Sequence, residues 1–201
     1  MEFLFIIAVL IMSVVIHEVA HGYMALALGD NTAKYQNRLT LNPLSHLDPV
    51  GSFFVPLMGY MLGGFIIGWA KPVPFNPYNL KNQKWGEAMV AFAGPLSNIV
   101  IAIVFGLFMR LTVAENLLSG PALGLLGFIV SINITLAVFN LIPLPPLDGS
   151  KILFAFLPLK MQNVRLAFER FGIVLVIFFI FFIWQYLGPL IFKLTNIIIG
   201  Y

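Results

Sequence analysis

A short motif near the start of the chain has the residue types and the spacing of a metal site. HEVAH, at residues 17–21, places two imidazoles four residues apart with a glutamate beside the first. On an α-helix such residues share one face, about 6 Å apart, so His17 and His21 could bind one metal ion, most often zinc. Glu18 could then reach a metal-bound water as a general base.

The motif lies within an apolar run, residues 11–28, that has the composition of a membrane span. Ionisable groups at the centre of a bilayer are costly unless something compensates them. A bound metal offsets that cost, whereas a coincidental match leaves three polar groups in the run unexplained. We therefore favour a metal site over a coincidence.

A catalytic zinc needs a third protein ligand and an open position. The chain has no cysteine, so the candidates are Asp30, His46, Asp48 and Asp148. Asp148 is favoured if the apolar segment before it runs parallel to the first span, because it then reaches the membrane half that holds the histidines. The prolines at 143–146 exclude regular helix and Gly149 permits a sharp turn. The alternative is that Asp148 only caps the helix that follows it.

Three further polar residues need an explanation. Asn98 and Asn140 are amides in apolar segments, and each could donate an N–H to a substrate carbonyl or a developing oxyanion. Hydrogen bonds between membrane helices are the equal alternative. His46 fits a loop turn in which it bonds to the backbone, and the alternative is a gate or auxiliary metal ligand.

The elements that position these residues are predicted to be membrane helices. Of the 201 residues, 60% are hydrophobic and 9% are charged, with a formal net charge of +3, whereas about 25% of residues in soluble domains are charged. The composition predicts an all-α polytopic membrane protein with about four full transmembrane helices, a re-entrant segment at 51–70 and a short β-hairpin near 31–50. The full spans are expected at residues 3–28, 88–110, 121–142 and 171–199.

The chain is interpreted as one membrane-embedded domain, 1–201. Its catalytic core would cover residues 1–160, and an interfacial helix followed by the last span would occupy 151–199. No basic leader with a small-residue cleavage site precedes the first span, so that span is expected to be retained. No basic run with interleaved aromatics is present, so nucleic acid is not an expected partner.

The topology depends on residues 51–70, which glycines and prolines interrupt. A full crossing divides the eleven basic residues seven to four, whereas a re-entrant segment leaves only Arg110 and Lys193 on the minority side. The other nine are Lys34, Arg38, Lys71, Lys81, Lys84, Lys151, Lys160, Arg165 and Arg170. We therefore predict re-entry, with the N-terminus outside and the basic side and the active site facing the cytoplasm.

Three motifs together resemble the site-2 protease family of intramembrane zinc metalloproteases. They are HEVAH at 17–21, GPLSN at 94–98 and NLIPLPPLDG at 140–149. The segments RLTLNPLSHLDPVG (38–51) and WAKPVPFNP (69–77) are similar to segments of its small prokaryotic members. The resemblance implies one Zn²⁺ per chain held by His17, His21 and Asp148, with Glu18 as catalytic base. Asn98 and Asn140 would line the active site.

The resemblance also implies a function. The family cleaves transmembrane segments of other proteins, so we expect a transmembrane protein or peptide as substrate, membrane lipids as surroundings and a prokaryotic cell (inner) membrane as location. From the length of the sequence we expect a small prokaryotic type without the PDZ or CBS domains of many members. An edge strand near 38–42 could pair with an extended substrate, and a plain surface hairpin is the alternative.

Two other functions use the same residues. A small metal-ion transporter would also carry polar groups in its spans, but it would be expected to show paired sites or repeats, and the sequence has neither. A catalytically inactive zinc-binding membrane scaffold is the other alternative. The intact motif at 17–21 together with Asp148 favours the enzyme.

Overall fold

The fold is built from helices. The computed structural model describes residues 2–54, 58, 61, 70–115, 117–118, 120–158 and 161–200. Over these residues it contains seven α-helices and no strand. They are α1 (Glu2–Ala27), α2 (Thr32–Tyr35), α4 (Gly86–Ala114), α5 (Gly120–Asn140), α6 (Asp148–Phe156), α7 (Gln162–Phe182) and α8 (Trp184–Ile199). Short helical turns η1 (Pro43–His46), η2 (Pro49–Phe54) and η3 (Pro77–Asn79) lie in the connections.

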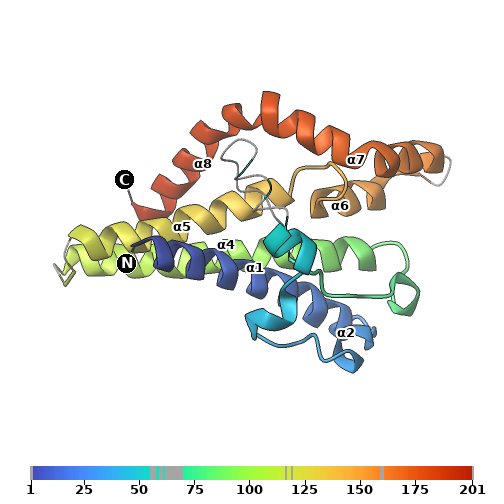
Figure 1. Cartoon of the computed structure of the whole chain (residues 1–201), viewed down its shortest axis with the longest axis horizontal. Coiled ribbons are helices and arrows are strands. Elements are labelled where there is room, and N and C mark those ends of the chain that lie inside the picture. The colour runs from blue at the N-terminus through green and yellow to red at the C-terminus, as the bar shows by residue number, and fades with distance from the viewer. Residues whose placement is uncertain are drawn as a thin grey trace.

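Helices α1, α4 and α5 pack side by side and form the centre of the molecule (Figure 1). Between α1 and α4, Ser13 pairs with Asn98 and His21 pairs with Val90, so these two helices are antiparallel. Between α1 and α5, Ser13 pairs with Asn133. The chain beyond the end of α5 reaches the histidines further along α1, so α1 and α5 run in the same direction.

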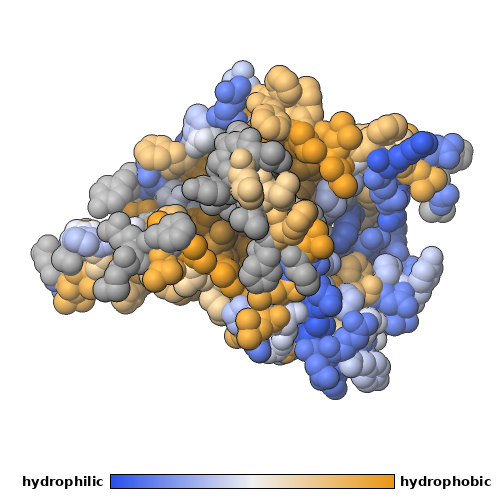
Figure 2. Space-filling model, viewed as in Figure 1, coloured by the Kyte–Doolittle hydropathy of each residue, from blue (hydrophilic) through white to orange (hydrophobic). Residues whose placement is uncertain are grey.

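Three of these helices are long and apolar enough to cross a bilayer, at Leu4–Ala27, Gly86–Ala114 and Gly120–Asn140. The outer face of α4 carries Val104, Leu107 and Phe108, which are 50–57% exposed and suit contact with lipid. Figure 2 shows hydrophobic surface over much of the molecule and hydrophilic residues gathered where α2, α6 and the starts of α4 and α7 lie. The chain is therefore an integral membrane protein, as its composition predicts.

The last predicted span differs from the expected single helix. Helices α7 and α8 are bent by 70° at their junction, and they make a fourth span only if the bent pair is counted as one. Pro189 lies one turn into α8 and cannot donate to the carbonyl of Gln185, and its ring crowds that carbonyl. Such a proline bends a helix on its N-terminal side, where Ile183 marks the break.

The predicted β-hairpin at 31–50 is wrong. That segment contains α2, an extended stretch at 38–42 and η1, and no strand forms among its described residues. Its polar groups bond inward to neighbouring backbone instead of to a paired strand: His46 Nε2 donates to the Thr40 carbonyl at 2.8 Å, and the His46 carbonyl accepts from Lys71 N–H at 2.8 Å. The edge strand predicted at 38–42 is therefore absent as well.

The re-entrant prediction for 51–70 falls mainly outside the described residues. Gly51–Phe54, Met58, Met61 and Ala70 are the described part of that segment. Its flanks meet, because Lys71 bonds to His46 across it. The shared direction of α1 and α5 is the arrangement that the prediction requires.

Candidate metal centre

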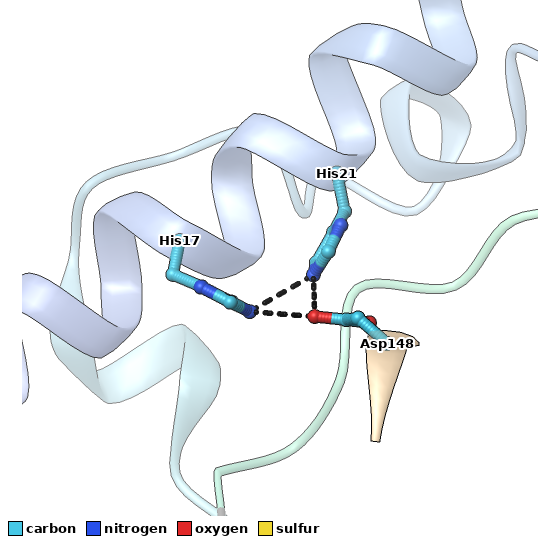
Figure 3. A group of neighbouring side chains, drawn as sticks. All are labelled: His17, His21 and Asp148. Carbon is cyan, nitrogen blue, oxygen red and sulfur yellow. Dashed lines mark hydrogen bonds and ion pairs between the residues drawn. The ribbon is translucent and has the colours of Figure 1, made fainter. Parts of the chain in front are cut away.

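Three buried side chains converge on one point beside α1 (Figure 3). His17 Nε2 lies 3.1 Å from Asp148 Oδ2, and His21 Nε2 lies 3.2 Å from the same oxygen. The two Nε2 atoms are 3.0 Å apart. Zinc bonds of about 2.0–2.1 Å in a tetrahedral site would separate neighbouring ligand atoms by about 3.3 Å. The observed triangle is within a few tenths of an ångström of that size.

The break after α5 brings Asp148 to the histidines. Asp148 is the first residue of α6 and follows the cap residue Leu147, and its carboxylate points to the imidazoles. Asp148 is therefore placed as a metal ligand would be. It is not the N-cap residue of α6, which is Leu147. Gly149 is needed for close approach, because a Cβ there would collide with the carbonyls of Leu141 and Ile142.

A glycine on α4 provides the space for both imidazoles. A Cβ on Gly94 would lie 2.5 Å from His21 Nε2 and 2.6 Å from His17 Nε2. Real Cβ atoms do not approach so closely, so any larger residue at this position would displace the rings. The GPLSN segment thus contributes to the site through the absence of a side chain at its first residue.

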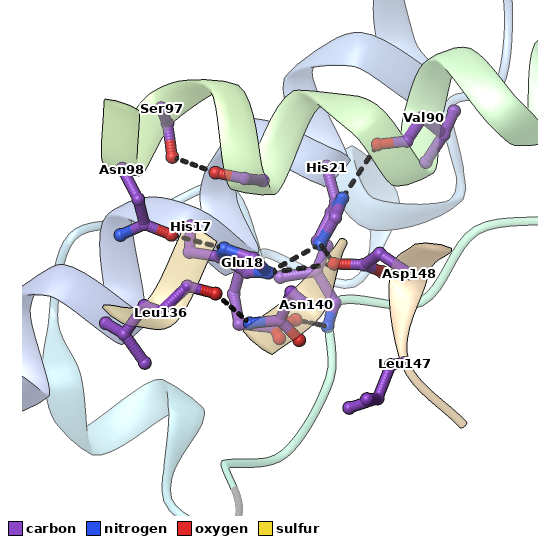
Figure 4. A network of polar contacts seen from close by, with 12 residues as sticks. His17, Glu18, His21, Val90, Ser97, Asn98, Leu136, Asn140, Leu147 and Asp148 are labelled. Carbon is purple, nitrogen blue, oxygen red and sulfur yellow. Dashed lines mark hydrogen bonds and ion pairs between the residues drawn. The ribbon is translucent and has the colours of Figure 1, made fainter. Parts of the chain in front are cut away.

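Each imidazole has an acceptor on its other nitrogen (Figure 4). His17 Nδ1 lies 2.6 Å from Asn98 Oδ1, and His21 Nδ1 lies 2.7 Å from the Val90 carbonyl oxygen. Both Nδ1 atoms therefore carry the proton and donate it, which leaves the Nε2 lone pairs for a metal. This is the tautomer that a zinc ligand needs.

Asn98 is fully buried and does not face the pocket. Its amide nitrogen donates to Asn133 Oδ1 at 2.9 Å and to the Ser13 carbonyl at 3.3 Å, which turns its oxygen to His17. Asn98 thus joins α4 to α1 and α5 by hydrogen bonds and also contacts His17. Asn133, which donates to Ser13 Oγ at 3.0 Å, was missed from the sequence although it too is an amide in an apolar helix.

Glu18 and Asn140 do face a pocket at the metal centre. The pocket has a volume of about 160 Å³ and is lined by His17, Glu18, His21, Pro72, Val73, Phe75, Asn140, Pro146, Asp148 and Lys151. Glu18 Oε2 accepts a hydrogen bond from the Val73 N–H at 2.8 Å. Asn140 Nδ2 donates to the Leu136 carbonyl at 3.0 Å and keeps a second N–H (Figure 4).

The other candidate ligands have different partners. His46 is bonded to backbone and stands outside the group of three ligands. Asp48 Oδ1 accepts the N–H groups of Val50 and Gly51. Burial alone would raise the pKa of Asp30, but hydrogen bonds from Thr32, Asn79 and Asn76 outweigh it and hold that pKa below its ordinary value.

Sequence comparisons find relatives that are named as zinc metalloproteases. A protein of Bacillus subtilis named "Putative zinc metalloprotease YwhC" is 35% identical over 184 residues, which are 89% of this chain and 80% of that protein. Residues 110–183 match the family model of peptidase family M50. The chain belongs to this family of zinc metalloproteases.

Two further relatives carry similar names. "Putative zinc metalloprotease Rip2" of Mycolicibacterium smegmatis is 29% identical over 176 residues, covering 87% of this chain and 66% of that protein. "Zinc metalloprotease MJ0392" of Methanocaldococcus jannaschii is 32% identical over 151 residues, covering 75% of this chain and 34% of that protein. No solved structure matches the chain.

Zinc fits the residues of this M50 peptidase. Two neutral imidazoles and one carboxylate are a donor set that catalytic zinc sites use, and they leave a fourth position open. The pocket beside these three residues is also lined by Glu18 and Asn140. The enzyme is therefore a zinc metalloprotease whose metal His17, His21 and Asp148 are arranged to bind.

Proposed function

We propose that this M50 peptidase cleaves peptide bonds within transmembrane segments of other membrane proteins. The observation that carries the proposal is the depth of the metal centre. His17 lies ten residues before the end of α1 at Ala27, which corresponds to about 15 Å along a helix axis at 1.5 Å per residue. A peptide bond cleaved there would lie inside the membrane, below its surface.

The proposed mechanism assigns tasks to five of the residues that line the metal pocket. Zinc, when bound, lowers the pKa of water and polarises a carbonyl. His17, His21 and Asp148 would hold it, and Glu18 would take a proton from the attacking water and pass it to the leaving amine. Asn140 directs its remaining N–H towards the substrate carbonyl oxygen.

Water and the polar flank of a substrate would enter from the hydrophilic end of the molecule. A larger cavity of about 680 Å³ lies there among the start of α4, α6 and the start of α7. Lys151 lines both this cavity and the metal pocket. Water would therefore reach the site from one side of the membrane. The substrate helix would unwind to present an extended segment to the site.

We further propose that this side is the cytoplasmic face of a prokaryotic inner membrane and that residues 51–70 re-enter it. Nine of the eleven basic residues would then be cytoplasmic. The joined flanks of the segment and the parallel directions of α1 and α5 support this arrangement.

Glu18→Gln tests the proposed activity. We expect purified wild type and variant to bind one zinc per chain, and only the wild type to cleave a transmembrane reporter in proteoliposomes. A metal transporter would instead move zinc across the vesicle membrane in both proteins, and an inactive scaffold would bind zinc without cleavage in either. Cleavage by Glu18→Gln would contradict the mechanism.

A further inference from the structure

An extended segment at residues 71–76, which we call the strap, lies along the metal pocket. Pro72, Val73 and Phe75 of the strap line that pocket. Val73 donates its backbone N–H to Glu18 Oε2 at 2.8 Å. Prolines on both sides of Val73 have no N–H, so the strap presents a single donor at this point. The residue before a proline is also restricted to extended conformations, which fixes the direction of that donor.

Three residues outside the pocket, Arg38, His46 and Asp30, fix the position of the strap by hydrogen bonds to its backbone. Arg38 Nη2 donates to the carbonyls of Lys71 and Pro72, at 2.8 and 3.3 Å. The Lys71 N–H donates to His46 O at 2.8 Å. At the other end, the Asn76 N–H donates to Asp30 Oδ2 at 2.7 Å. Val73 therefore lies between anchored residues, with Lys71 and Pro72 before it and Asn76 after it.

Arg38 is the anchor that carries a buried positive charge. Its residue surface is only 8% exposed, so its charge is largely removed from water, and burying a charge is costly unless strong contacts compensate it. Charge-assisted hydrogen bonds to carbonyls supply such contacts. A guanidinium also offers a rigid planar set of donors, which a lysine ammonium does not reproduce.

We propose that Arg38 and the Val73 N–H position Glu18 for catalysis. Arg38 fixes the strap, the strap fixes the Val73 N–H, and that N–H holds Oε2 of Glu18 so that Oε1 is left to handle the proton. This inference rests on the proposed role of Glu18 as the base. It gives one shared task to Arg38 and to residues 71–73, which lie in the two segments at 38–51 and 69–77 that resemble the family.

The sharpest test removes the hydrogen-bond donor at residue 73. Val73→Pro removes the N–H by closing the ring onto the nitrogen, and Val73→Ala is the control because it also removes the two valine methyl groups but keeps the N–H. Loss of an outer contact to a metal-site group typically costs about 10- to 100-fold in activity. We expect kcat of Val73→Pro to lie about that far below kcat of Val73→Ala, with equal KM and equal zinc content.

A second pair tests the anchor. Arg38→Gln should lower kcat of the reporter reaction at unchanged zinc content, and Arg38→Lys should restore part of it. Hydrogen exchange of the peptide containing residues 71–76 gives a readout independent of turnover: the Val73 amide should exchange faster in Glu18→Ala and in Arg38→Gln than in the wild type.

The outcomes separate the inference from the proposed function. If the wild type does not cleave or Glu18→Gln does, the proposed function fails and the inference fails with it. If the wild type cleaves but Val73→Pro and Val73→Ala have the same kcat, the strap does not position Glu18. If Val73→Pro does not fold, equal kcat in the wild type and Arg38→Gln, or an unchanged exchange rate in Glu18→Ala, overturns the inference.

Discussion

At the scale of single residues, Asn98 sets which nitrogen of His17 carries the proton in the candidate metal centre. Its oxygen accepts the Nδ1 proton of His17, while its nitrogen is held by Asn133 and Ser13. We expect Asn98→Ala to weaken zinc binding by about 10- to 100-fold, because the proton on His17 loses its acceptor. Chelator competition on the purified protein measures this affinity.

Asn133→Ala is the graded control for Asn98→Ala. It removes the contact that orients the Asn98 amide but leaves the Asn98 oxygen in place, so its zinc affinity should fall between those of wild type and Asn98→Ala. An affinity for Asn98→Ala equal to that of the wild type would show that His17 needs no acceptor at Nδ1.

The cluster of His17, His21 and Asp148, which could hold a metal ion, could be predicted from the sequence, but the contacts that support its imidazoles could not. The spacing of His17 and His21 on a helix gives their shared face directly, and the proline-broken segment explains how Asp148 departs from the helix line. Hydrogen bonding within the membrane depends on how α4 and α5 are rotated about their axes. The spacing of residues along one helix does not give its rotation relative to its neighbours. The hydrogen-bond partners of Asn98 and Asn133 were therefore found only in the structure.

At the scale of elements, the close approach of α1 and α4 depends on Gly94. Gly94→Ala places a Cβ within 2.6 Å of both imidazole Nε2 atoms, so we expect bound zinc below one per chain and lost cleavage. Gly124→Ala on α5 is the matched control, because a Cβ there meets nothing within 4 Å. Zinc analysis of both purified variants should show a loss only in Gly94→Ala.

Asp30 joins the end of α1 to the strap and to η3. Its pKa is lowered in the folded protein, so its stabilising effect is complete above the unfolded pKa of about 4 and is lost as the pH falls through the lower folded pKa. Asp30→Asn should reduce the free energy of unfolding by about 1–3 kcal/mol at pH 7. Thermal unfolding in detergent should show this difference shrinking below about pH 4. A difference constant down to pH 3 would contradict a role for the charge.

At the scale of the whole molecule, hydropathy predicted the central helices well and the irregular parts poorly. The predicted spans at 88–110 and 121–142 lie within a few residues of α4 and α5. The bend at Ile183 and the missing hairpin are different cases. Pro189 signals a bend but not its angle. The hairpin predicted near 31–50 gave no hint that the Arg38 side chain and the His46 carbonyl bond to the backbone at residues 71–72.

The orientation in the membrane is the last prediction and can be read with single cysteines, since the native chain has none. Tyr78, which is 86% exposed, precedes α4, and Leu117, which is 69% exposed, follows it, so the two should lie on opposite sides. An impermeant thiol reagent should label Leu117→Cys in intact cells and Tyr78→Cys only after permeabilisation. The opposite pattern would place the basic side and the active site outside. Labelling of both in intact cells would exclude α4 as a full span.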